Sequence, residues 1–169
     1  PGVEATTGPL GQGIANAVGM ALGSKILNEQ VVIKDKPLVD YNVYVLCSDG
    51  DLMEGVSYEA CSLAGTLNLD NLILLYDSNG ISLDGDTSNT FTENILARFE
   101  AMGWHTDFVR NGDDVDAIDK AIDKAKRSGK PSLIEVKTII GNGSLLQGTN
   151  KVHGTNLSDE DIKQLKIKL

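Results

Sequence analysis

The chain contains few cysteines, prolines and aromatic residues, and each shortage excludes a class of protein. Of its 169 residues, two are cysteine and four are proline, and aromatic residues make up 5%. Four prolines beside 18 glycines do not form a Pro-rich linker or a disordered composition. Cys47 and Cys61 lie in apolar segments without a C-x-x-C spacing. We therefore expect reduced core thiols of a cytoplasmic protein rather than a disulfide or a thiol catalyst.

Basic residues and long apolar runs are also scarce. The chain has 15 Lys and Arg against 24 Asp and Glu, a formal net charge of −9. Nucleic acids and anionic membranes reward clustered basic residues, so we expect neither as a partner. No apolar run approaches the roughly 20 residues of a membrane helix, and no signal peptide is evident. Because the first residue is Pro1 rather than Met, we expect the chain to be a piece of something longer.

Hydrophobic patterning predicts alternating strands and helices in one domain. Near-continuous apolar runs at 43–47, 72–76 and 133–140, with a weaker run at 104–109, are typical of strands covered on both faces. Helical patterns occupy 14–27, 54–67, 91–102 and 114–128, and Ser158 with Asp161 opens a short last helix. The alternation predicts an α/β fold: a doubly wound, mostly parallel sheet with helices on both faces.

Two of these helices have apolar stripes that we expect to face the core. In the helix at 54–67 the stripe consists of Val56, Ala60, Leu63, Ala64 and Leu67. In the helix at 114–128 it consists of Val115, Ile118, Ala121, Ile122 and Ala125. The glycine-rich segment 141–156 is long for a structureless connection and is a candidate functional loop.

An acidic cluster follows the first predicted strand, in the stretch 45–55, VLCSDGDLMEG. Asp49 stands where that strand ends, and Asn79 stands at the end of the next strand, 30 residues later. Ligands of open parallel sheets bind beyond the carboxyl ends of the strands. Neighbouring strands lie ~4.8 Å apart, so a carboxylate and an amide oxygen would reach one ion. Such oxygen ligands suit Mg²⁺ shared with a phosphate-bearing cofactor.

Simpler explanations exist for these residues. Asp and Asn after strands are ordinary turn residues. A calcium loop beginning at Asp49 has Met53 and Glu54 where an oxygen ligand and a glycine are wanted, and one beginning at Asp84 fails similarly. A dinucleotide-binding fingerprint at 8–13 fails because no strand precedes it. His105, which has no motif around it, is expected to be a surface or edge histidine.

Taken together, these segments resemble the diphosphate-binding domain of transketolase, a thiamine diphosphate enzyme. The general motif of such enzymes is Gly-Asp-Gly followed about thirty residues later by Asn, and here it is Ser48-Asp49-Gly50 with Asn79. The resemblance extends to PGVEATTGPLGQG at 1–13, LMEG at 52–55, GSL at 143–145 and VHG at 152–154. It covers nearly the whole chain. Ser48 departs from the pattern, which puts in doubt any backbone geometry that needs a positive φ there.

The resemblance implies a set of site residues. The implied ligands of Mg²⁺ (or Ca²⁺) are the Asp49 carboxylate, the Asn79 side chain and the Ile81 carbonyl. The implied cofactor-binding residues are Gly8, Pro9 and Leu10 along the rings, and Gly50, Asn79 and His153 at the diphosphate. His153 is also implied as the catalytic residue that aids proton transfer, and Glu54 as an acid at the subunit interface. Asp51 receives no role from the resemblance, and at the start of a helix it is expected to complement the dipole.

The resemblance also implies a function for the intact protein. Transketolases are homodimers that move a two-carbon ketol unit between ketose and aldose phosphates in the pentose phosphate pathway. We expect residues 1–169 to form a single domain, with the pyrimidine-binding and C-terminal domains absent from this chain, so that the chain alone lacks turnover. Two alternatives stay open: another thiamine diphosphate enzyme, such as a deoxyxylulose phosphate synthase or a 2-oxo acid dehydrogenase component, and a non-catalytic α/β binding module.

Overall fold

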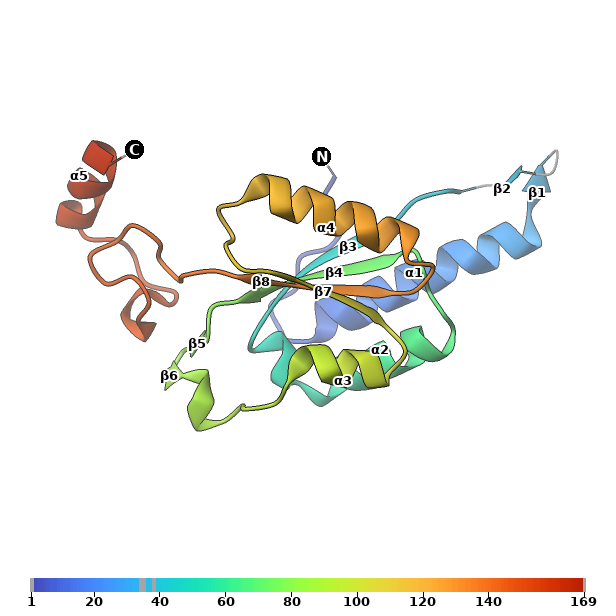
Figure 1. The fold of residues 1–169 in the computed structure, drawn as a ribbon, viewed down its shortest axis with the longest axis horizontal. Helices are drawn as coiled ribbons and strands as arrows, with labels where there is room; N and C mark the ends of the chain where they lie inside the picture. Colours follow the sequence, from blue (N-terminus) through green and yellow to red (C-terminus); the bar gives the residue numbers. More distant parts are fainter. Residues whose placement is uncertain (1, 34–35, 38, 169) are drawn as a thin grey trace.

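A parallel β-sheet forms the centre of the molecule in the computed structural model, which describes residues 2–33, 36–37 and 39–168 (Figure 1). Within these residues its four strands lie in the order β3-β4-β8-β7, and every neighbouring pair is parallel. Their bounds are β3 (Val43–Ser48), β4 (Leu72–Ser78), β7 (His105–Val109) and β8 (Ser132–Lys137). The predicted sheet is confirmed, although the strand predicted at 133–140 ends three residues early.

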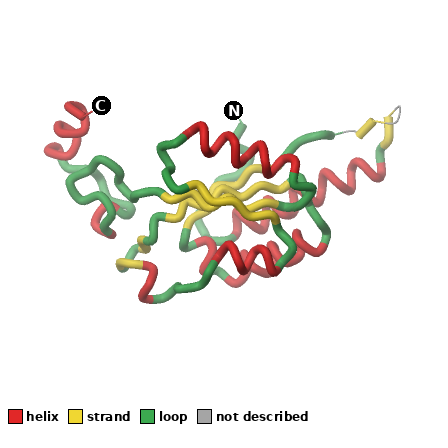
Figure 2. Tube along the Cα trace, in the orientation of Figure 1, coloured by secondary structure: helices red, strands yellow, loops and turns green. Residues whose placement is uncertain are grey.

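Helices cover both faces of this sheet, as predicted (Figure 2). On one face lie α1 (Gln12–Gln30), α2 (Gly55–Thr66) and α3 (Ile95–Ala101), and on the other lies α4 (Val115–Arg127). The chain moves from β3 through β4 to the far edge at β7, then returns through α4 to place β8 in the middle. This reversal makes the sheet doubly wound. The carboxyl ends of all four strands therefore lie along one side of the sheet. We call this side the carboxyl edge of the sheet, and ligands of such folds bind there.

Side chains of the central strands alternate between two hydrophobic cores, as the period-two geometry of a strand requires. Leu72, Leu74 and Tyr76 of β4 join the core beneath α1, α2 and α3. Ile73 of the same strand lies in the core beneath α4. On β3, the face that points away from α1 is uncovered, and Leu46 is 84% exposed.

Two predicted helix stripes need correction. The core face of α2 consists of Ser57, Cys61 and Ala64, whereas Leu63 and Leu67 are about half exposed. Small residues face the core because α2 packs closely against α1. In α4 the central part of the stripe is confirmed, but Val115 in its first turn is 72% exposed, since the helix begins there beyond the edge of the core.

The shorter elements connect this framework. They are β1 (Val32–Ile33) with β2 (Lys36–Pro37), β5 (Ile81–Ser82) with β6 (Gly85–Asp86), the 3₁₀ helices η1 (Asp51–Met53), η2 (Thr87–Asn89) and η3 (Asn150–Val152), and the helix α5 (Asp159–Lys168). The predicted capping start of α5 is confirmed, because the Asp161 amide donates to Ser158 Oγ at 3.1 Å. The segment that leads to α5 lies beyond the carboxyl ends of the strands (Figure 1).

The two cysteines are free and buried, as predicted. Burial raises the pKa of the Cys61 thiol to about 12 and also raises the pKa of Cys47. The Cys61 carbonyl accepts a hydrogen bond of 2.9 Å from Nε1 of Trp104, the single tryptophan. Trp104 in turn packs edge-on against Phe99, with ring centroids 5.0 Å apart. These contacts fix α2 against the turn that precedes β7.

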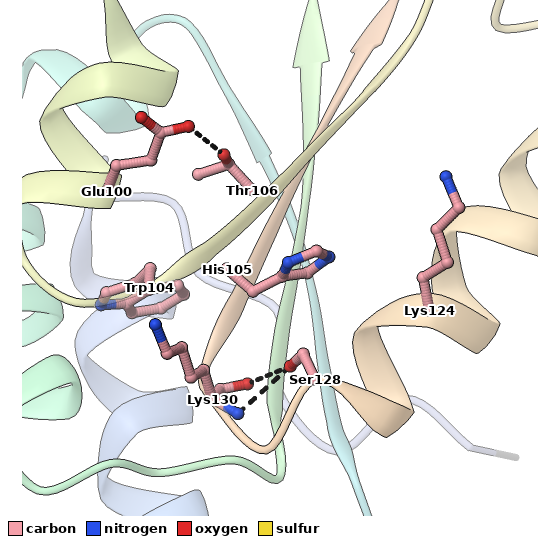
Figure 3. A pocket seen from close by; sticks show the side chains of 7 residues that line it. All are labelled: Glu100, Trp104, His105, Thr106, Lys124, Ser128 and Lys130. Atoms are coloured by element: carbon pink, nitrogen blue, oxygen red, sulfur yellow. Dashed lines mark hydrogen bonds between the residues drawn. The ribbon is translucent and has the colours of Figure 1, made fainter.

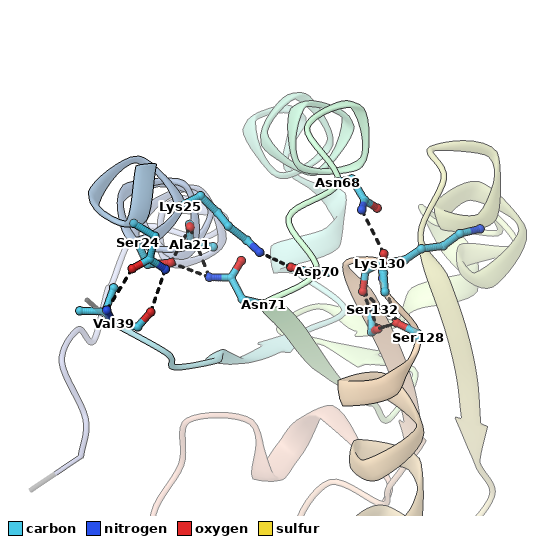
Figure 4. Close-up of polar contacts among 12 residues, drawn as sticks. Ala21, Ser24, Lys25, Val39, Asn68, Asp70, Asn71, Ser128, Lys130 and Ser132 are labelled. Atoms are coloured by element: carbon cyan, nitrogen blue, oxygen red, sulfur yellow. Dashed lines mark hydrogen bonds and ion pairs between the residues drawn. The ribbon is translucent and has the colours of Figure 1, made fainter. Parts of the chain in front are cut away.

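Polar contacts hold together the amino ends of the strands, opposite the predicted site (Figure 4). Asn71, just before β4, donates to Ser24 Oγ of α1 at 2.7 Å. Lys25 of α1 pairs with Asp70. On the other side of the sheet, Asn68 donates to the Gly129 carbonyl at 3.0 Å. These contacts join the amino ends of the strands to the surrounding helices and turns.

Candidate functional site

Asp49 is a buried carboxylate at the carboxyl end of β3. Its side chain is 4% exposed, and three hydrogen bonds reach it. Oδ1 accepts the Tyr76 hydroxyl at 2.6 Å, and Oδ2 accepts the backbone amides of Asn79 at 3.3 Å and Gly80 at 3.1 Å. Among the described residues no Lys, Arg or His forms an ion pair with it. A buried charge needs compensation, and the remaining lone pairs of this carboxylate can accept a cation.

Tyr76 is the neighbour that orients Asp49. Burial raises the pKa of Tyr76 above its ordinary value, and the hydrogen bond to Asp49 raises it further. The phenol therefore stays protonated and donates to the carboxylate at physiological pH. Sequence reasoning missed this contact. The contact between Tyr76 and Asp49 could be predicted only from the pairing of Cys47 on β3 with Tyr76 on β4. That pairing requires the register of the two strands.

Asn79 and Ile81 form a tight turn directly after β4. The Asn79 side-chain oxygen accepts the Ile81 amide at 2.9 Å, and Gly80 between them has a φ of 73°, a left-handed conformation that glycine adopts without strain. The Gly80 carbonyl accepts the Thr87 amide at 3.0 Å, which fastens the turn to η2. The turn thus brings the three predicted metal ligands, Asp49, Asn79 and Ile81, to one place.

The chemistry of this donor set fits Mg²⁺ or Ca²⁺. One carboxylate, one amide oxygen and one backbone carbonyl are hard oxygen donors, and Mg²⁺ usually keeps further positions for water and phosphate. Within the described residues no group of three or more His, Cys, Asp and Glu side chains could hold a metal. An ion at this edge would therefore be coordinated by the Asp49 carboxylate together with amide and backbone carbonyl oxygens.

The glycine-rich segment before α1 lies against the loop that carries Asp49. A Cβ on Gly50 would stand 3.1 Å from Leu10 Cδ1, so Leu10 already fills the space over Gly50. Gly8, Pro9 and Leu10 themselves are exposed. Ser48 ends β3 without a positive φ, so the doubt that its replacement of glycine raised is removed. The structure thus brings the residues predicted to line the rings beside the predicted diphosphate donor.

Glu54 and His153 are exposed at the periphery of this site. Glu54 precedes α2, and no side-chain capping bond is formed there. His153 follows η3, whose Asn150 donates to the Leu83 carbonyl at 3.3 Å. That contact brings the loop of His153 to the edge of the sheet where Ile81 lies. Among the described residues, no hydrogen bond joins the His153 side chain to Asp49 or Asn79.

A hollow of about 220 Å³ borders Asp49 and Tyr76. On its wall Lys137 of β8 donates to Ser78 Oγ at 2.6 Å and pairs with Glu135 at 3.0 Å. This polar group escaped sequence reasoning, because Glu135 and Lys137 interrupt an apolar strand without any motif. Lys137 is already neutralised by Glu135, so it leaves the Asp49 charge unpaired.

A second hollow, of about 390 Å³, lies at the opposite end of β7 (Figure 3). His105 lines it, and its strand is an edge strand, as predicted, although its ring is half-buried and its Nε2 atom has no partner among the described residues. Lys124 on the far wall is paired with Asp107 at 3.0 Å, and Glu100 adds a negative charge. The mixed charge and the distance along the strands separate this hollow from the edge that carries Asp49.

Comparison with known proteins matches the chain to one family. The family model described as "Transketolase, thiamine diphosphate binding domain" matches residues 1–169. The chain belongs to this family. A probable transketolase of Streptococcus pneumoniae is 55% identical over 161 residues, and the transketolase of Aquifex aeolicus is 51% identical over 168. These alignments cover 95% and 99% of this chain but 24% of each relative. The chain thus spans about a quarter of the length of these transketolases.

Solved transketolase structures have the same fold. The structure of the Pichia stipitis transketolase in complex with sedoheptulose-7-phosphate superposes with a TM-score of 0.95 at 52% identity, over 99% of this chain and 25% of that one. A transketolase from Leishmania mexicana has a TM-score of 0.95 at 53% identity, with the same coverage. The predicted fold and family are confirmed. No helix in the described ranges is long and apolar enough to cross a membrane.

Proposed function

We propose that the protein to which this chain belongs transfers a two-carbon ketol unit between ketose and aldose phosphates, as a cytoplasmic enzyme of the pentose phosphate pathway. The relatives that support this proposal are transketolases, and the Pichia stipitis enzyme was crystallised with a sugar phosphate. Residues 1–169 form a single domain, the diphosphate-binding part of the enzyme. The pyrimidine-binding and C-terminal domains belong to the remaining three quarters of such a protein.

The observation that carries the proposal is the buried Asp49 carboxylate, which has hydrogen bonds but no cationic partner among the described residues. We assign Mg²⁺ (or Ca²⁺) to this position, held by Asp49, the Asn79 side chain and the Ile81 carbonyl. The cation offsets the carboxylate and lets a chain of net charge −9 hold a diphosphate.

The remaining residues of the edge hold and orient the cofactor. Gly50 donates its backbone amide to the diphosphate, and the segment 8–10 lines the rings. Thiamine diphosphate, when bound, supplies the carbon that carries the two-carbon unit. His153 reaches the diphosphate and the substrate and assists proton transfer between substrate atoms. Its place on an exposed loop beside the metal edge supports this role.

Exposed apolar side chains on two helices support a homodimer. On α1 they are Met20, Ile26 and Leu27, and on α2 they are Leu63 and Leu67. Apolar surface of this kind is typical of protein interfaces. Glu54, directly before α2, is exposed and is assigned to the subunit interface. Because half of the cofactor site belongs to other domains in this proposal, the 169-residue chain alone should lack ketol transfer.

Calorimetry on the full-length protein tests the metal assignment. Thiamine diphosphate should bind wild type only with Mg²⁺, and Asp49→Asn should lower the affinity by about 100-fold or more, since loss of an outer-shell partner already costs 10- to 100-fold. The control is Asp77→Asn, which neutralises an exposed carboxylate two residues before Asn79 and should bind as wild type does. Equal affinities of wild type and Asp49→Asn would contradict the assignment.

A further inference from the structure

Asp51 accepts three hydrogen bonds from two segments, one at Gly11, 40 residues before it, and one at Ser48, three residues before it. Its Oδ1 accepts the Gly11 amide at 3.0 Å. Its Oδ2 accepts the Ser48 amide at 2.9 Å and the Ser48 hydroxyl at 3.0 Å. All three partners are donors, and within the described residues no Lys, Arg or His pairs with this carboxylate. A carboxylate satisfies them because it is a pure acceptor with two oxygens.

These contacts differ from those expected of a helix-start residue. Asp51 does begin η1, but the amides that its carboxylate binds belong to Gly11 and Ser48, outside that helix. The residue before η1, Gly50, provides no side-chain cap. A simple interaction with the helix dipole therefore does not describe the role of Asp51.

The two segments that Asp51 joins are the two halves of the proposed cofactor site. Gly11 directly follows the segment 8–10, which is assigned to the rings. Ser48 directly precedes Asp49, which is assigned to the metal. One carboxylate therefore lies between the part of the chain that contacts the rings and the part that holds the cation and the diphosphate.

The fit between these segments is too close for other residues at Gly11. Gly11 has a φ of 77°, and a Cβ there would stand 2.8 Å from Ser57 Oγ and 2.9 Å from Glu54 Cβ. Ser57 Oγ also donates to the Asp51 backbone carbonyl at 2.5 Å. The Gly11 amide is thus held facing the Asp51 carboxylate from two sides.

We propose that Asp51 is a positioning residue that clamps the ring-lining segment 8–11 to the metal-binding loop and so sets the separation of the two halves of the cofactor site. Ser48 assists, because its hydroxyl supplies a third donor that the glycine of the general motif cannot supply. This inference rests on the function proposed above. It gives a physical reason for two neighbouring residues, Ser48 and Asp51, that the resemblance to transketolase left without a role.

The test compares two ligands on the full-length protein, thiamine diphosphate and inorganic diphosphate, each with Mg²⁺. In Asp51→Asn the new amide group must face the donors of either Gly11 or Ser48, so the clamp opens without a change of side-chain size. Affinity for thiamine diphosphate should fall about tenfold, the loss expected for one or two hydrogen bonds to a charged group. Affinity for inorganic diphosphate, which has no rings, should stay within about twofold.

Two further experiments distinguish loss of the clamp from misfolding of Asp51→Asn: a milder variant, Ser48→Gly, and hydrogen exchange at the Gly11 amide. Ser48→Gly should lower thiamine diphosphate affinity about threefold in wild type and by a smaller factor in Asp51→Asn, because both changes act on one set of contacts. Hydrogen exchange at the Gly11 amide should accelerate in Asp51→Asn while the amides of β3 stay protected. Asp77→Asn is the matched control and should change none of these quantities.

The outcomes separate this inference from the proposed function. An unchanged affinity of Asp51→Asn for thiamine diphosphate would overturn the inference. An equal loss for both ligands would also overturn it, because Asp51 would then support the metal loop rather than position the rings. A wild-type protein that fails to bind thiamine diphosphate would overturn the proposed function, and the inference with it.

Discussion

A single methyl group added at Gly65 should destabilise the fold by about 2–4 kcal/mol. Gly65 lies in α2, and a Cβ at this position would stand 1.9 Å from the Met102 carbonyl oxygen and 3.2 Å from Trp104 Cδ1. Because non-bonded carbon atoms normally keep about 3.5 Å from their neighbours, the turn at Met102 must move by more than about 1 Å.

The magnitude follows from three contributions. Overpacking against backbone costs about 1–3 kcal/mol, and replacing glycine by alanine inside a helix returns about 1 kcal/mol. The displaced turn also carries the Trp104 hydrogen bond to the Cys61 carbonyl and the edge-on contact with Phe99. Weakening these two contacts costs about 1 kcal/mol each, so the net loss is about 2–4 kcal/mol.

Urea unfolding followed by Trp104 fluorescence measures this loss, because the chain has a single tryptophan and it is buried. Gly19→Ala in α1 is the control: no atom lies within 4 Å of its added Cβ, so it should stabilise the chain by about 0.5–1 kcal/mol. If Gly65→Ala proves as stable as Gly19→Ala, the packing explanation is wrong.

Three further predictions concern buried and capping groups. Tyr76→Phe should lower the free energy of unfolding by about 2 kcal/mol in urea titrations, since Asp49 loses its hydroxyl donor; a loss below about 0.5 kcal/mol would refute this. The bond from the Leu145 amide lowers the pKa of Asp161, so its stabilisation is present above the unfolded pKa of about 4 and is lost as the pH falls below it. Hydrogen-exchange protection of α5 should therefore drop in acid, and Asp161→Asn should show low protection without this pH step. Burial raises the pKa of both thiols, so iodoacetamide at pH 8 should modify Cys61 and Cys47 only after unfolding; native modification would contradict their burial.

Most of the architecture was predictable because it depends on local periodicity. The apolar runs at 43–47 and 72–76 form neighbouring parallel strands, and the helices between strands cover both faces. The predictions failed where the packing of one element against another determines which face is buried. Leu63 in α2 and Leu67 directly after it match a helical period, yet the packing of α2 against its neighbours buries Ser57 and Cys61 instead.

The composition of the site was also predictable, but its internal contacts were not. Asp49 and Asn79 could be found because each follows a strand, and parallel strands end at one edge of a sheet. Tyr76 could not be assigned to Asp49, because that contact depends on the register of β3 against β4. Glu135 and Lys137 share one face of β8 by the period of a strand, but their contacts with Ser78 could not be assigned, because they depend on the register of β4 against β8.

Asp51 shows where sequence information ends for this protein. Residue type and spacing are properties of the chain, and they were enough to indicate the fold class, the family and the position of Asp49 and Asn79 at the carboxyl ends of neighbouring strands. The direction of each carboxylate is a property of the folded molecule. Asp49 and Asp51 are two residues apart, yet one faces Tyr76 and the amides after β4 while the other faces Gly11 and Ser48. Only the packing of the segment before α1 against the end of β3 decides that difference, because it brings Gly11, 40 residues away in the sequence, to the carboxylate that Ser48 also contacts.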